Sequence, residues 1–112
     1  MLEVNEKDGV VILKFEESDR FNAIVAEQVR SRLLDYFSKP NTKLIFNLEG
    51  IRFIDSSGFS AFLSAMKAAN NNYGQFKICN VDEDVKELFR VLQLHNVFDL
   101  YGSVEEALGE FE

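Results

Sequence analysis

The sequence has few of the residues that support metal, disulfide or nucleotide chemistry. It contains one cysteine, Cys79, and one histidine, His95, in 112 residues. A single cysteine excludes an intrachain disulfide and is typical of a reducing cytoplasm. One histidine and one cysteine without ligand spacing predict no metal site. The phosphate-loop and dinucleotide-binding signatures are also missing, so no cofactor is expected.

Positive charge and long apolar runs are scarce as well. Twelve Lys and Arg residues face nineteen Asp and Glu residues, which gives a formal net charge of −7. Nucleic-acid binding depends on Lys and Arg, and anionic membranes attract the same residues, so neither is an expected partner. No apolar run approaches the length that spans a membrane, and the first residues lack the pattern of a signal peptide. We therefore expect a cytoplasmic protein without membrane insertion, which leaves protein or cationic partners.

The sequence does contain enough apolar residues for a globular core, with a hydrophobic share of 46%,. Its length favours one domain over residues 1–112. Apolar runs predict strands at 2–4, 10–15, 44–48, 76–81 and 97–101,. A period near four predicts helices at 22–37, 57–70, 82–92 and 103–108,. This alternation predicts an α/β fold with a mixed, mostly parallel sheet of about four to five strands and four helices.

Short polar signals mark the ends of these elements. Asn22, Asp55 and Asp82 are expected N-caps,, and Ser103 with Glu106 matches a capping box,. Asp8-Gly9 predicts a hairpin between the first two strands. Gly74 is expected to take the left-handed conformation after the second helix. We further expect Ile24 beside the apolar face of the first helix, residues 16–20 as a loop, and Phe53 in the core.

The stretch KLIFNLEGIRFIDSSG, residues 43–58, is the centre of the chain. It leads from a strand into a helix whose start carries Asp55, Ser56 and Ser57, and a helix N-terminus offers unpaired backbone N–H groups to an anion. Taken alone, Ser56 is a cap or a local hydrogen-bonding residue. A catalytic nucleophile would need a base, but His95 lies far along the chain and the pattern Gly-x-Ser-x-Gly is absent.

The motif and its surroundings resemble a known family. Asp8-Gly9-Val10, the run IDSSGF with Gly50 before it, Leu94 to Phe98 and the closing SVEEAL occur in this order. Together they resemble the STAS domain of bacterial anti-sigma factor antagonists, over roughly Val4 to Leu108. The resemblance implies a STAS-type sheet with helices packed mainly on one face.

The resemblance also implies a function. In that family a serine of the Asp-Ser-Ser/Ala-Gly motif, which corresponds to Ser56, is phosphorylated by a partner kinase. The unmodified protein binds this anti-sigma factor and serine kinase and thereby frees a sigma factor. Phosphorylation dissociates the complex, and a serine phosphatase then removes the phosphate and restores the binding form. The chain would then be a binding module and not an enzyme, with a partner surface that includes Asn22, Asp55, Ser56, Ser57 and Gly58.

Two other functions stay open at this point. One is a STAS subunit that scaffolds a transporter or sensory complex without phosphorylation, and the other is a small serine hydrolase. The chain also departs from the family pattern in three places. Asn22 replaces the usual acidic residue on the partner surface, Gln93 stands where many members have glycine, and Phe59 replaces a common leucine.

Overall fold

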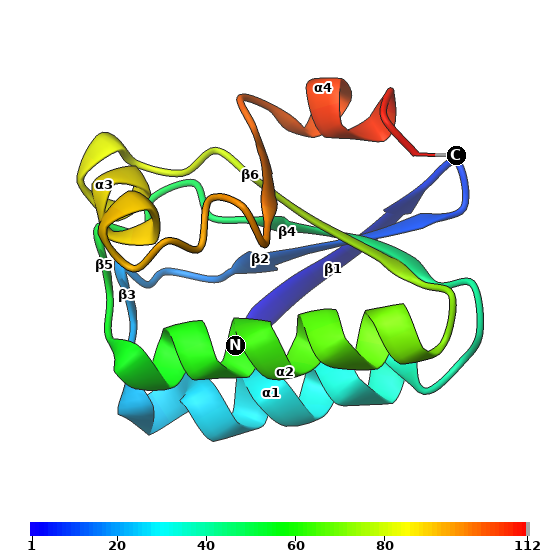
Figure 1. Ribbon diagram of the computed structural model, residues 1–112, viewed down its shortest axis with the longest axis horizontal. Helices are drawn as coiled ribbons and strands as arrows, with labels where there is room; N and C mark the ends of the chain where they lie inside the picture. The colour runs from blue at the N-terminus through cyan, green and yellow to red at the C-terminus, as the bar shows by residue number, and fades with distance from the viewer. Residues whose placement is uncertain (112) are drawn as a thin grey trace.

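The structure is a computed structural model that describes residues 1–111, and its centre is a five-stranded sheet (Figure 1). The strand order is β1-β2-β4-β6-β7. β1 pairs with β2 antiparallel, and every other neighbouring pair is parallel. The strands are β1 (Leu2–Lys7), β2 (Val10–Phe15), β4 (Lys43–Asn47), β6 (Gln75–Cys79) and β7 (Asp99–Tyr101). The predicted mixed, mostly parallel sheet is confirmed.

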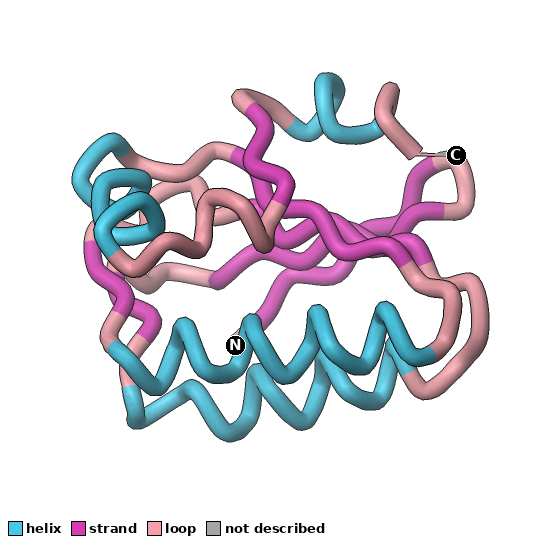
Figure 2. Tube along the Cα trace, viewed as in Figure 1, coloured by secondary structure: helices cyan, strands magenta, loops and turns pink. Residues whose placement is uncertain are grey.

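Four helices accompany the sheet in the described residues, as predicted. They are α1 (Ala23–Phe37), α2 (Ser56–Asn71), α3 (Glu83–Val91) and α4 (Val104–Leu108). The two long helices α1 and α2 lie side by side under one face, whereas the short α4 covers part of the opposite face (Figures 1 and 2). Because parallel strands are joined by crossovers, this arrangement brings the first residues of α1 and α2 to the same edge of the molecule.

The main core lies between the sheet and the α1–α2 layer and is rich in phenylalanine. The ring of Phe62 on α2 lies 5.0–6.2 Å, centroid to centroid, from four other rings. Phe46 and Ile78, on the two central parallel strands, are fully buried. A smaller core under α4 contains the apolar residues of the other sheet face, among them Ile45 and Cys79. Phe59 is buried against Phe89, so the core accepts the larger ring at that position.

Two very short strands were missed by the sequence reasoning. β3 (Arg20–Phe21) and β5 (Phe53–Ile54) pair in parallel as a separate sheet. The expected loop therefore ends in a strand, and the expectation that Phe53 joins the core is wrong. Neighbouring strand residues point to opposite sides, so Ile54 is buried while Phe53 stays 44% exposed under the guanidinium of Arg20. This small sheet joins the start of α1 to the start of α2.

Two further expectations need correction. The left-handed residue after α2 is Tyr73, with φ 58°, and not Gly74. The helix ends at Asn71, one residue later than expected, and the Gly74 N–H donates back to the Ala69 carbonyl oxygen at 2.7 Å, so the left-handed position falls on Tyr73,. Gly74 is needed for space instead, since a Cβ there would lie 3.0 Å from the Thr42 carbonyl oxygen. Ile24 does not lie beside the apolar face of α1 but is 84% exposed. The hairpin prediction is confirmed, with positive φ at Asp8 and Gly9.

Candidate functional site

The carboxylate of Asp55 ties the starts of α1 and α2 together. Its Oδ1 accepts a hydrogen bond from the Gly58 N–H of its own helix at 3.1 Å. Its Oδ2 accepts one from the N–H of Ala23, the first residue of α1, also at 3.1 Å. The backbone N–H of Asp55 donates to the Phe21 carbonyl oxygen of β3. Asp55 is therefore the predicted N-cap of α2, and it also satisfies one unpaired donor of α1.

Asn22 caps α1 from the neighbouring position. Its side-chain oxygen accepts a hydrogen bond from the Ile24 N–H at 3.1 Å, as the sequence predicts for an N-cap. The backbone N–H of Ala23 donates to Asp55 and that of Ile24 donates to Asn22, so these two side chains together bind the first two N–H groups of α1. An asparagine does this without a charge. The departure from the usual acidic residue therefore leaves the helix start intact, and one negative charge fewer lies beside Asp55.

The predicted motif residues differ in their exposure. Ser56, the first residue of α2, is exposed, and Ser57 is half-buried. Gly58 is buried because α2 starts close to β3 and β5. A Cβ on this residue would lie 2.8 Å from the Phe21 carbonyl oxygen and 2.7 Å from Ile54 Cγ2. Glycine is thus required for the close approach that places Ser56 at the surface.

A groove of about 560 Å³ runs between the first halves of α1 and α2. Its lining residues are Ala23, Ala26, Glu27, Arg30, Ser56, Ser57, Ser60 and Ala61. Arg30 is the cationic residue of this lining. Its Nη1 lies 3.3 Å from Glu27 Oε1, and its Nε donates to Ser64 Oγ at 3.4 Å. Sequence reasoning did not identify Arg30, because no local pattern places it next to the 55–58 segment.

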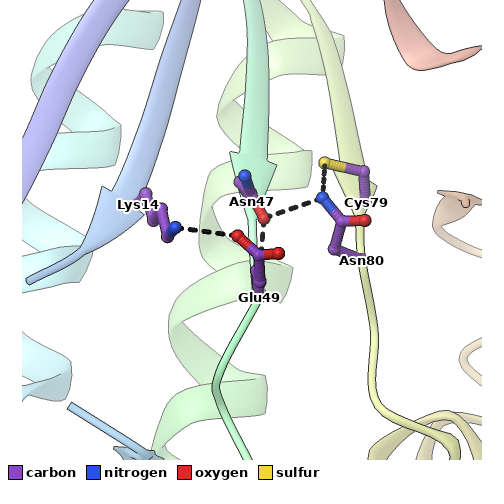
Figure 3. Close-up of polar contacts among 5 residues, drawn as sticks. All are labelled: Lys14, Asn47, Glu49, Cys79 and Asn80. Carbon is purple, nitrogen blue, oxygen red and sulfur yellow. Dashed lines mark hydrogen bonds and ion pairs between the residues drawn. The ribbon is translucent and has the colours of Figure 1, made fainter. Parts of the chain in front are cut away.

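A second polar network fixes the chain between β4 and the motif (Figure 3). The Asn47 side-chain oxygen accepts hydrogen bonds from the Glu49 N–H at 2.9 Å and from Asn80 Nδ2 at 3.0 Å. Lys14 Nζ donates to Glu49 Oε1 at 2.8 Å, and this hydrogen bond lowers the pKa of Glu49 and raises the pKa of Lys14. The contacts link the carboxyl ends of three strands, and they hold the turn that leads to β5 and α2.

Cys79 lies at the edge of this network but is not a reactive thiol. It is fully buried, and burial, followed by the negative charges of Glu105 and Glu49, raises its thiol pKa to about 12. The prediction that Cys79 is a small buried apolar residue is confirmed. The thiolate is the nucleophile in cysteine chemistry, so this position offers none near neutral pH.

The structure does not bring His95 to Ser56. His95 is exposed in the loop after α3, as expected, and lines a different groove together with Glu87 and Arg90. Within residues 1–111, no cluster of three or more His, Cys, Asp and Glu side chains is arranged to hold a metal ion. Over the same residues no helix combines the length and apolar character needed to cross a membrane.

Comparison with known proteins identifies the family. The family model of the STAS domain matches residues 1–107. The chain belongs to the STAS domain family. The anti-sigma F factor antagonist of Paenibacillus polymyxa is 24% identical over 112 residues, which cover 99% of this chain and 94% of the relative. The protein of the same name from Lysinibacillus sphaericus is 31% identical over 90 residues, or 80% of this chain and 74% of the relative.

Solved structures agree with this assignment. The STAS domain protein from Planctomyces limnophilus, described as an anti-sigma-factor antagonist, superposes with a TM-score of 0.87. Its sequence is 24% identical, and the match covers 96% of this chain and 94% of that one. The expected resemblance is thus confirmed for both sequence and fold. The STAS fold places the IDSSGF run where a helix begins beside a second helix start.

Proposed function

We propose that this STAS domain, residues 1–112, is an anti-sigma factor antagonist switched by phosphorylation of Ser56. In the unmodified state it binds an anti-sigma factor that is also a serine kinase, and a sigma factor is freed. The kinase then phosphorylates Ser56 and the complex dissociates. A serine phosphatase restores the unmodified form. The chain itself acts as a binding module, in the cytoplasm, and not as an enzyme.

The exposed hydroxyl of Ser56 is the observation that carries this proposal. A kinase must reach the oxygen atom that it modifies, and of the two motif serines Ser56 is the exposed one whereas Ser57 is half-buried. In the proposed reaction the Ser56 Oγ attacks the γ-phosphorus of ATP. The bond from that phosphorus to the oxygen bridging to the β-phosphate breaks, ADP leaves, and the hydroxyl proton passes to a base of the kinase.

The site can hold the resulting phosphate without unfolding. An anion at a helix N-terminus is stabilised by typically about 0.3–1 kcal/mol. Asp55 opposes this because it is a neighbouring negative charge, yet both of its oxygens already accept backbone N–H groups. The added charge therefore acts mainly on the partner, which must accept about −1.5 to −2 charges where a hydroxyl was bound.

The proposed partner surface includes Asn22, Asp55, Ser56, Ser57 and Gly58, and we add Ile24 to it. Ile24 lies two residues after the cap of α1, and Asp55 binds the residue before it, so Ile24 is close to the motif. A side chain with 84% exposure contributes little to folding. Exposed apolar residues close to a functional group are suited to a protein interface. A kinase bound over Ser56 would cover it.

The test is incubation of the protein with ATP and a candidate serine kinase, for example one encoded by a neighbouring gene, followed by tandem mass spectrometry. We expect one phosphate, mapped to Ser56, and release of the kinase in a pulldown. Ser57→Ala is the matched control and should be modified like the wild type, whereas Ser56→Ala should bind and remain bound. Phosphate only on Ser57 would overturn the site assignment.

Two further assays on the same protein variants separate the two alternatives. Stable binding to a transporter or sensory protein, with no phosphorylation under these conditions, would favour the scaffold function. Hydrolysis of an acyl ester that is lost in Ser56→Ala would favour the small serine hydrolase. No observation in the described structure favours either one over the switch.

A further inference from the structure

We infer that Arg30 is an internal receptor for a phosphate monoester on Ser56. The inference rests on the proposed function, since it concerns the modified form of the same serine. Ser56 and Arg30 line one groove, although they lie on different helices and 26 positions apart in the sequence. In the unmodified protein the guanidinium is bound elsewhere, to Glu27 and Ser64.

The position of Arg30 along α1 suits this role. Asp55 holds Ala23 of α1 beside the start of α2, so Ser56 lies near the level of Ala23. Arg30 is seven residues further along, which is about 10 Å at 1.5 Å per residue. Long side chains on a helix lean toward its N-terminus, which is the direction of Ser56. Ser64, which Arg30 Nε contacts, lies eight residues past Ser56, or about 12 Å along α2 at the same rise,. The guanidinium must therefore leave Ser64 and turn toward the start of the groove to reach a phosphate on the Ser56 Oγ.

The present contacts of Arg30 are weak enough to be exchanged. Its pair with Glu27 is an exposed i,i+3 pair at 3.3 Å, and pairs of this kind contribute little,. Its bond to Ser64 is long, at 3.4 Å, and involves a neutral hydroxyl. A phosphate offers charged oxygens that a guanidinium can bind through two N–H groups, and such bonds are roughly twice as strong as neutral ones.

Two carboxylates near the groove oppose the binding of a phosphate by Arg30. Glu27 faces Arg30 from α1, and the Asp55 carboxylate lies at the start of α2. Both are negative and repel a phosphate. Arg30 compensates this repulsion when its guanidinium turns from Glu27 to the phosphate. The modified protein would then present a changed groove to the partner, with Ser64 and Glu27 released.

The experiment installs phosphoserine at position 56 during synthesis of the full chain, so that no kinase is needed. Phosphorus NMR then measures the second pKa of the phosphate in the wild type and in Arg30→Gln. A guanidinium favours the dianion and lowers this pKa. We therefore expect the pKa to rise by about 0.5–1 unit in Arg30→Gln. Arg32→Gln, which removes the same charge from the same helix outside this groove, should match the wild type.

A second readout follows the arginine itself. On phosphorylation the Nε signal of Arg30 should shift in the wild type, and Arg30→Lys should restore part of the pKa effect, because lysine keeps the charge but loses the fork of donors. Equal phosphate pKa values in all these variants would overturn the inference. Failure of any kinase to modify Ser56 would contradict the proposed function, but this measurement would still report on Arg30.

Discussion

At the scale of single residues, the Asp55 carboxylate decides the geometry around Ser56. Each of its oxygens accepts one backbone N–H, and the two donors belong to different helices. An asparagine could keep one of these bonds but not both, because its nitrogen is a donor. The side chain thus fixes the spacing of two helix starts and the negative charge beside the serine at once.

The apolar residues show where sequence periodicity stops being informative. Phe46 and Ile78 belong to long buried strands, and their burial could be predicted from the runs around them. Ile24 and Phe53 lie at the ends of their elements. A shift of one residue in where such an element begins decides whether the side chain faces the core or the solvent. Their exposure depends on the exact start of α1 and on the β3–β5 pairing. No local sequence pattern predicts the exact start of α1 or the β3–β5 pairing.

Cys79 provides a prediction on pH. Its thiol pKa is raised from an ordinary 9.0 to about 12, so the folded state keeps a proton that the unfolded state loses above pH 9. Unfolding then releases a proton, and stability must fall as the pH rises from about 9 to 12. Compared with Cys79→Ala, the wild type should lose its stability advantage over this range in urea titrations. A constant difference between pH 7 and pH 11 would contradict this.

Ile24 provides a prediction on binding. Ile24→Asp places an acidic residue in the first turn of α1, which has none, and gains typically about 0.3–1 kcal/mol from the helix dipole,. The nearby carboxylates of Asp55 and Glu27 oppose this gain, so the free energy of unfolding should change by less than about 1 kcal/mol,. The same change should weaken kinase binding by at least about 1–2 kcal/mol, or roughly 5- to 30-fold. Isothermal titration calorimetry and urea unfolding on the same samples measure both.

The matched control for Ile24 is Tyr73→Asp. Tyr73 is 81% exposed and lies just past the other end of α2, away from the motif. Asp tolerates the left-handed backbone that Tyr73 adopts. This variant should bind the kinase like the wild type. Equal loss of binding in both variants would show a general charge effect and no apolar contact at Ile24.

At the scale of elements, the caps were the most predictable part of the structure. Asn22, Asp55, Asp82 and Ser103 each cap the helix that follows them. These residues act on amides two or three positions away, so a local reading is sufficient. β3 and β5 could not be found in this way. Strands of two residues show no period, and they exist because Phe21 and Ile54 meet in the folded chain.

The end of α3 shows how an unusual residue is accommodated. Gln93 takes the left-handed conformation, with φ 59°. The Leu94 N–H donates to the Phe89 carbonyl oxygen at 2.7 Å, and the Gln93 N–H donates to that of Arg90 at 3.0 Å. This is a Schellman motif, in which glycine is the usual left-handed residue. The departure from the family pattern at Gln93 therefore changes the residue but keeps the turn.

Gln93→Gly should consequently stabilise the protein. A side chain in the left-handed region costs about 1–2 kcal/mol, and glycine removes this cost. The larger conformational freedom of glycine in the unfolded chain offsets roughly 0.5–1 kcal/mol of this gain. We expect a net gain of up to about 1 kcal/mol in urea unfolding. Gln93→Ala is the control and should show no gain, and a gain of equal size in both would mean that backbone strain is not the cause.

At the scale of the whole molecule, the sheet order determines what the site contains. Crossovers through α1 and α2 place both helices on one face with their first residues together (Figure 1). The fold class and most strands could be predicted, because runs and periods extend over many residues. The contact of Asp55 with Ala23 and the shared groove of Ser56 and Arg30 could not. Both contacts join residues that are far apart in the sequence. How far one helix is shifted along the other depends on their packing and not on a local sequence pattern.

The switch itself is a property of the whole domain, and Ser56→Asp tests it. An aspartate at the first position of α2 gains from the helix dipole, typically about 0.3–1 kcal/mol, while the charge of Asp55 opposes it. The two effects nearly cancel, so the melting temperature should change by only a few degrees. In the complex the new charge lies against a surface that fits a hydroxyl. Such an unpaired buried charge costs about 2–5 kcal/mol, or roughly 30- to several thousand-fold in affinity.

Two neutral variants at the same position separate charge from size. Ser56→Asn has nearly the shape of Ser56→Asp without its charge and should bind the kinase more tightly than Ser56→Asp does. Ser56→Ala should keep fold and binding, and ATP should no longer release it. Calorimetric binding and thermal melts on the three proteins give both quantities. If Ser56→Asp melts far below the wild type, the modification acts by unfolding. If it binds as tightly as the wild type, charge at this position does not control the complex, because the desolvation cost expected for an interface over Ser56 is then missing.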